Sequence, residues 1–276
     1  MFTIHVISDL RLGLTEQTPE EEQNLPDVDL VILNGNIGVL KRTIMYAFEL
    51  CKKYPDVQFV YNDGQLERYW GQAPKETKWE HENSLGMRIS SSDDWPKNLH
   101  WRDPRKEAGM LITLRTGKVV DIYTDYGFPK IVSYTGDWKE TDWYKNYCIV
   151  AEYVHNLPKW GIWPEEANIV KQGVIPLWFT KDYINDIFSQ SELKLKRWES
   201  GKDRSKIHSK ILVTHLSHHP DVQYKNCKVS PYVIHMRDKV WVTSGSKVDQ
   251  SNFLGGRLYS NPGRGILARS QTFSMD

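Results

Sequence analysis

Five segments of the chain place polar residues where a predicted strand ends: SDLRLG (8–13), NGNIG (34–38), YNDGQLERY (61–69), VTHLSHHP (213–220) and WVTSGSK (241–247). They contain side chains that bind divalent cations in other proteins: the Asp9 carboxylate, the Asn36 and Gln65 amides and the His215 imidazole. Because the carboxyl ends of parallel strands meet at one edge of a sheet, these residue types predict a site at such an edge.

Two cations in the same segments argue against a metal ion. Arg11 follows Asp9 by two positions, and Lys247 ends the last segment. Arginine stays protonated and a lysine ammonium has no acceptor atom, so neither can ligate a metal. At ~4 Å and an effective dielectric near 20, a side-chain cation and each unit of positive charge on a metal ion repel one another by roughly 4 kcal/mol.

The elements that would carry these residues follow from the hydrophobic pattern. Short apolar runs predict strands over Ile4–Ser8, Leu30–Leu33 and Val57–Tyr61. Gly38–Tyr54 has apolar residues at helical spacing and lysines in its last turn, with a proline directly after it, which predicts an amphipathic helix. The order strand, strand, helix, strand indicates a parallel sheet with its site at the carboxyl ends of the strands.

Beyond the first ~60 residues, the sequence predicts a less regular order of secondary structure elements. GMLITLRTGKVVDIYTDYG (109–127) predicts an antiparallel hairpin that turns at Thr116-Gly117. Residues 129–180 carry five tryptophans among glycines and prolines and predict an irregular insertion with some helix. The other expected elements are a helix over Lys181–Glu199, a strand over Ile211–Thr214, a hairpin around Arg237-Asp238, and a terminal strand and turn in GRLYSNPGRG (256–265).

Composition disfavours a membrane protein and a strongly basic nucleic-acid-binding protein. The 276 residues fit one domain, and a formal net charge of +1 provides no strong field to attract nucleic acid or an anionic membrane. Cys51, Cys148 and Cys227 are far apart, which favours buried thiols in a reducing compartment. No apolar run approaches the ~18 residues of a membrane span. We therefore expect a soluble cytoplasmic protein with no membrane partner.

The ordered series of strand ends resembles the calcineurin-like metallophosphoesterase family, whose strand ends supply D-x-H, G-D, G-N-H-E, a lone His and G-H-x-H. The segment LYSNPGRG also resembles the S-N-P turn that follows the last motif in many members, so the resemblance spans about residues 1–265. It implies an α/β fold with four layers (α/β/β/α), in which helices flank two mixed sheets. It also implies a hydrolase in which two metal ions, ~3.5–4 Å apart, position a hydroxide for attack on phosphorus.

Residue by residue, this chain departs from the family at most metal positions. Asp9 and His215 match, whereas the other positions are changed: Arg11 replaces the His of D-x-H, Asn36 the bridging Asp, Gln65 the ligand Asn, Leu66 the catalytic His, and Gly245 and Lys247 the two His of G-H-x-H. The resemblance places Asp9, Arg11, Asn36 and Lys247 at the first metal position and Asn36, Gln65, His215 and Gly245 at the second. It thereby implies that Arg11 and Lys247 replace the charge of a metal and pair with Asp9; the alternative that both point into solvent stays open. We expect no metal; if one bound, its ligands would come from Asp9, Asn36, Gln65 and His215.

These departures predict a vestigial site without a confident catalytic residue. Leu66 removes the general acid, and His218 and His219, the nearest substitutes, lie in a turn where histidines are usually exposed. We expect a catalytically degenerate protein without a cofactor. It would bind a phosphate-containing ligand or a protein partner through Arg11, Asn36, His215, Lys247 and Arg264.

Two alternatives stay open. One is a divergent phosphoesterase that uses Mn²⁺ or Mg²⁺, with Asp9 and His215 in the reaction. The other is a nucleic-acid-binding protein that uses the tryptophan-rich segment and the basic stretches KLKRW and KDRSK; the near-zero net charge disfavours it.

Overall fold

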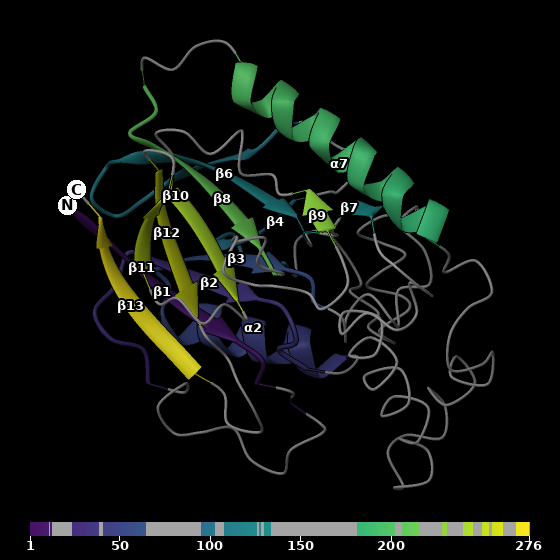
Figure 1. The fold of residues 1–276 in the computed structure, drawn as a ribbon. Coiled ribbons are helices and arrows are strands. Elements are labelled where there is room, and N and C mark those ends of the chain that lie inside the picture. The colour runs from purple at the N-terminus through teal and green to yellow at the C-terminus, as the bar shows by residue number, and fades with distance from the viewer. Residues whose placement is uncertain are drawn as a thin grey trace, which may run out of the picture.

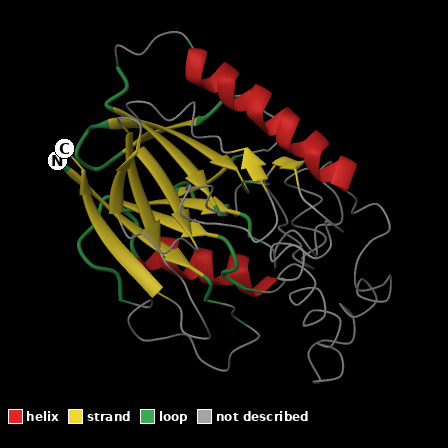
Figure 2. Cartoon of the chain, in the orientation of Figure 1, coloured by secondary structure: helices red, strands yellow, loops and turns green. Residues whose placement is uncertain are grey.

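The computed structural model has a mixed α/β fold with two mixed sheets and few helices (Figure 1). The residues that it describes are 1–10, 12, 24–38, 41–64, 95–102, 108–125, 127, 130–133, 181–201, 206–215, 228–230, 240–244, 250–253, 256–261 and 269–275. Figure 2 colours the helices and strands of these residues by type.

The first sheet has the strand order β13-β1-β2-β3-β4. Its strands are β1 (Phe2–Ser8), β2 (Leu30–Asn34), β3 (Gln58–Asn62), β4 (Leu99–Trp101) and β13 (Arg269–Met275). β1 to β4 are parallel, and helix α2 (Lys41–Lys53) connects β2 to β3, as the sequence pattern predicts. β13 pairs antiparallel with β1 and was not predicted, because RSQTFSM lacks a clear apolar alternation.

The second sheet has the strand order β11-β12-β10-β8-β6-β5. Its strands are β5 (Met110–Thr113), β6 (Val119–Asp125), β8 (Ser209–Thr214), β10 (Val240–Ser244), β11 (Gln250–Phe253) and β12 (Gly256–Asn261). β5 and β6 form the predicted hairpin, and Gly117 takes the left-handed conformation in its turn (φ 79°).

Two sequence predictions for this region are wrong. β10 lies between β8 and β12 and is parallel to both, so no side of it remains for the hairpin expected around Arg237-Asp238. Lys130–Ser133, expected to be irregular, forms β7 and pairs with β9 (Lys228–Ser230). Both errors concern long-range pairing, which local turn signals do not specify. The rest of the tryptophan-rich segment, Cys148 and Cys227 lie outside the described residues.

The core lies between the two sheets, with a helix on the outer face of each (Figure 1). Apolar side chains of β1, β2 and β3 meet those of β5, β6, β8 and β10. α2 covers the outer face of the first sheet, where Cys51 is buried and its pKa is raised by desolvation to about 12. Neither α2 nor α7 (Lys181–Ser200), the two described helices, combines the length and apolar character needed to cross a membrane.

The carboxyl end of helix α7 packs against the second sheet. Trp198 is buried and its ring lies 5.2 Å from that of Tyr123 on β6. Lys210 on β8 donates a hydrogen bond of 2.8 Å to the Trp198 carbonyl and lies 3.8 Å from the Asp121 carboxylate. Burial raises the pKa of Asp121, and the charge of Lys210 opposes that rise. The last turn of α7 is thus tied to both β6 and β8.

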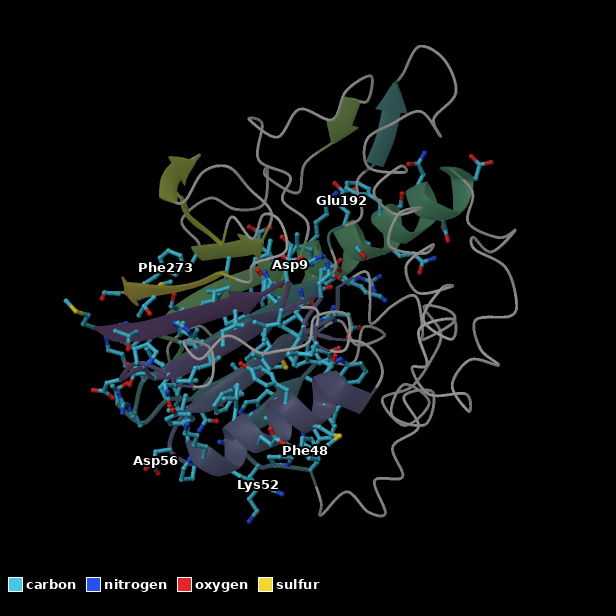
Figure 3. The ribbon with its side chains drawn as sticks, turned by 90° about the horizontal axis from the view of Figure 1, so that it is seen from below. Asp9, Phe48, Lys52, Asp56, Glu192 and Phe273 are labelled. Atoms are coloured by element: carbon cyan, nitrogen blue, oxygen red, sulfur yellow. The ribbon has the colours of Figure 1, made fainter. Side chains whose placement is uncertain are left out.

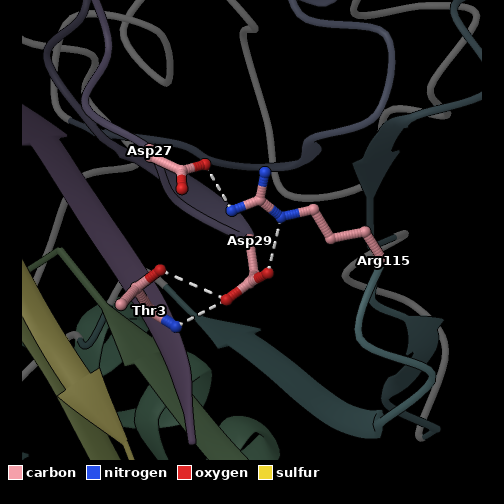
Figure 4. Close-up of polar contacts among 4 residues, drawn as sticks. All are labelled: Thr3, Asp27, Asp29 and Arg115. Atoms are coloured by element: carbon pink, nitrogen blue, oxygen red, sulfur yellow. Dashed lines mark hydrogen bonds and ion pairs between the residues drawn. The ribbon is translucent and has the colours of Figure 1, made fainter.

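A buried carboxylate joins the two sheets at the amino ends of β1 and β2 (Figure 4). Asp29 accepts a hydrogen bond from the Thr3 amide (2.8 Å). It accepts another from the Nε of Arg115 (2.7 Å), a residue in the turn between β5 and β6. Arg115 also donates to the exposed Asp27. Burial would raise the pKa of Asp29, but the hydrogen bonds from Arg115 and Thr3 outweigh it and hold the pKa below its usual range.

Candidate functional site

The inner faces of the two sheets change from apolar to polar at the carboxyl ends of their strands. Because side chains alternate between faces, the residue two positions after each apolar core residue points to the same layer. Five such residues close the core at this end, and we call them the polar layer: Ser8, Asn34, Asn62, Thr124 and His215. None is more than 5% exposed. Polar side chains of both sheets therefore meet at the edge where the sequence predicts a site.

Two asparagines of the polar layer connect the sheets. Asn62 Nδ2 donates to Asn34 Oδ1 (2.9 Å) and to the carbonyl of Asp125 at the end of β6 (3.0 Å). Asn34 Nδ2 in turn donates to the Thr214 carbonyl at the end of β8 (2.9 Å). Asparagine can serve here because its amide donates and accepts at once, whereas a carboxylate could only accept. The network fixes the spacing between the two sheets at the site.

His215 is oriented by the first sheet although it follows a strand of the second. Its Nδ1 lies 2.9 Å from the Asn34 carbonyl oxygen. A carbonyl only accepts, so Nδ1 carries the proton, and in the neutral ring Nε2 carries the lone pair. This is the arrangement by which proteins fix the tautomer of a histidine that acts through Nε2.

Asp9 and Asn36 face one another at the ends of β1 and β2. Asn36 Nδ2 donates a hydrogen bond of 2.9 Å to Asp9 Oδ1, and the two residues are 5% and 6% exposed. Both have a left-handed backbone, with φ of 57° at Asp9 and 53° at Asn36, which Asp and Asn tolerate better than other non-glycine residues. Figure 3 shows Asp9 at the end of β1, far from Lys52 and Asp56 near the end of α2.

Two glycines allow these backbones to approach. A Cβ on Gly35 (φ 78°) would lie 2.4 Å from the Nδ1 of His215 and 2.7 Å from Gly64 Cα. A Cβ on Gly64 would lie 2.2 Å from the Asn36 amide nitrogen. The Gly35 carbonyl also accepts a hydrogen bond from the Asp9 amide (3.1 Å). Gly35 is therefore the point around which Asp9, Asn36 and His215 are assembled.

Arg102, one residue after β4, supports the polar layer from the side. Its guanidinium donates twice to the Thr124 carbonyl, from Nε (2.8 Å) and Nη2 (2.6 Å), and lies 3.9 Å from the centre of the Tyr123 ring. The next carbonyl, that of Asp125, accepts the hydrogen bonds from Asn62 and from the His215 amide (3.3 Å). A buried arginine thus anchors the segment of β6 that receives the network.

The structure brings together the described residues of the predicted site, Asp9, Asn36 and His215, around Gly35. The remaining predicted site residues lie outside the described residues: Arg11, Gln65, Leu66, Lys247 and Arg264. Gly245, His218 and His219 lie outside them too.

Sequence reasoning missed Asn34, Asn62 and Arg102. For the two asparagines a signal existed, because each ends an apolar run on the residue that the strand alternation turns toward the core. No local pattern marks Arg102.

The donor set around Asp9 does not fit a divalent cation. The amide nitrogen of Asn36, a donor, is directed at the carboxylate that a metal would need. Within the described residues, no group of three or more His, Cys, Asp and Glu side chains is placed to hold a metal ion. Of the predicted site residues that the structure describes, Asp9 supplies a carboxylate and His215 an imidazole, and both are buried and hydrogen-bonded.

Comparison with protein-family models and with curated proteins finds no relative of this chain. No protein-family model matches the chain, and no curated protein matches its sequence. The likeness to metallophosphoesterases therefore rests on the order of the strand-end motifs.

Proposed function

We propose that this protein is a catalytically degenerate member of the metallophosphoesterase fold that binds a phosphate-containing ligand or a phosphorylated protein partner. Its fold would be the four-layer α/β/β/α sandwich. The two facing sheets, with α2 outside one and α7 outside the other, support this assignment. The meeting of five strand ends at one edge supports a ligand site there.

The hydrogen bond from Asn36 to Asp9 is the observation that best supports a loss of hydrolytic activity. In the family a carboxylate at the Asn36 position would bridge two metal ions, and the Asp9 carboxylate would ligate one of them. Here an amide N–H occupies the space between the two side chains at 2.9 Å. Asp9 is thereby satisfied without a cation, and a metal entering this space would lose one ligand and meet a positive dipole.

The charge that a phosphate ligand needs would come from Arg11, Lys247 and Arg264. Arginine suits phosphate oxygens because its planar fork donates two parallel hydrogen bonds. The matched variants Arg11→Met and Lys247→Met keep much of the side-chain length and remove the charge. Each is expected to weaken the binding of inorganic phosphate, measured by isothermal titration calorimetry.

The test of the whole proposal measures metal content by inductively coupled plasma mass spectrometry, with and without added Mn²⁺, beside phosphomonoesterase and phosphodiesterase assays. The expected result is negligible bound metal, no turnover, and measurable phosphate binding. About one or two metals per chain together with turnover would refute it.

The orientation of His215 favours a second candidate, a divergent phosphoesterase. With Nδ1–H donated to the Asn34 carbonyl, the lone pair of the neutral ring is on Nε2, the nitrogen that would ligate a metal or transfer a proton. In that case His215→Asn abolishes a hydrolysis that the wild-type protein shows. A screen of phosphomonoesters and phosphodiesters without turnover removes this candidate.

A further inference from the structure

One hydroxyl of the polar layer is not used by its hydrogen-bond network. Ser8 is 0% exposed, and its Oγ has no hydrogen-bond partner among the described residues. A buried hydroxyl without a partner destabilises a folded protein, and native structures contain few of them. A serine in this state in the polar layer, directly before Asp9, points to a partner that binds there.

The place of Ser8 fits such a role. It is the last residue of β1 and directly precedes Asp9, and strand alternation puts it in the same layer as Val6 and the inter-sheet core. On one side, the β1–β2 register leads from the pair Ile7 and Leu33 to Ser8 and Asn34. On the other side, β13 places Arg269 opposite Ser8.

We propose that Ser8 is a ligand-binding residue whose hydroxyl donates a hydrogen bond to an oxygen of a bound phosphate group. This inference rests on the proposed function, because it takes phosphate as the ligand. The hydrogen bonds that Asn34 and Asn62 donate in the polar layer go to groups of the protein itself. A serine hydroxyl rotates to suit its acceptor, and its hydrogen bond to an anion is stronger than one to a neutral group.

The test compares Ser8→Ala with a matched control, Thr43→Val. Thr43 on α2 is also 0% exposed, and its Oγ1 has no hydrogen-bond partner among the described residues, but it packs near Gly38 on the α2 side of the first sheet. Each protein is titrated with inorganic phosphate and with O-phosphoserine by calorimetry, and its stability without ligand is measured by urea unfolding.

The expected result separates ligand binding from stability. Ser8→Ala weakens the binding of both probes about tenfold or more, with unchanged or increased stability, because only the ligand uses the hydroxyl. Thr43→Val binds both probes as the wild type does. Ser8→Ala with wild-type affinity overturns the inference and leaves the proposed function standing. A parallel loss of affinity and stability also overturns it, since Ser8 is then a structural residue. If the wild-type protein binds neither probe, the proposed function fails and the inference fails with it.

Discussion

Replacing Asn36 by aspartate would introduce the carboxylate that the proposed likeness to metallophosphoesterases places at this position. In this protein the new oxygen would stand where Nδ2 stands now, 2.9 Å from Asp9 Oδ1. At an effective dielectric near 20, two unit charges at that distance repel by about 6 kcal/mol. Taking up one proton at pH 7 costs less, about 4 kcal/mol for a carboxyl with an ordinary pKa near 3.9. Asn36→Asp should therefore fold with one shared proton and lose about 4 kcal/mol of stability at pH 7.

The pH dependence identifies this cause. The folded variant holds one proton that the unfolded chain has released above its pKa of about 4, so the stability deficit grows by ~1.4 kcal/mol per pH unit between pH 4 and 7. Below about pH 4 both states are protonated and the deficit disappears. The comparison variant Asn36→Ala loses the hydrogen bond and places alanine at a left-handed position, and it should lose a constant ~2–3 kcal/mol across the same range.

The assay is urea unfolding of wild type and both variants at half-unit steps from pH 4 to 8, with and without Mn²⁺. A deficit for Asn36→Asp that does not change with pH would refute the reasoning from carboxylate repulsion. A stability restored by Mn²⁺ would show that the site still accepts a metal, against the proposed loss of the metal centre.

Three further outcomes test the structure elsewhere. Burial lowers the pKa of His5 to about 4 from 6.5; the unfolded chain takes up the proton first, so wild-type stability should fall by roughly 3 kcal/mol between pH 6.5 and 4. His5→Gln should lack that fall in urea unfolding, and an equal fall in both proteins contradicts it. Gly35→Ala should cost more than ~3 kcal/mol or prevent folding, because its Cβ meets an imidazole at 2.4 Å; Gly117→Ala, also left-handed but with no atom within 4 Å, should cost only ~1 kcal/mol. Equal thermal stability of these two variants contradicts the close packing. Lys210→Met should lose about 3–5 kcal/mol by leaving the buried Asp121 carboxylate without its cation. A double-mutant cycle with Asp121→Asn that shows no coupling contradicts this ion pair.

Much of the fold could be read from the sequence where its cause is local. The apolar runs of β1, β2 and β3 and the 3.6-residue period of α2 place these elements within a few residues. Thr116-Gly117 predicted the β5–β6 turn because a hairpin turn of this kind needs a left-handed glycine. β13 and the position of β10 could not be found, since strand order depends on which distant edges pair.

The sequence by itself determined which residue types stand at the strand ends, and thus the amide at Asn36 and the imidazole at His215. Only the tertiary structure decided how they meet. Asn36 Nδ2 contacts Asp9, and His215 Nδ1 contacts the Asn34 carbonyl. Both contacts form beside Gly35, whose missing side chain leaves room for the His215 ring and for the backbone of Gly64. Contacts between residues 181 positions apart, such as that of Asn34 with His215, depend on sheet packing, which no local pattern encodes.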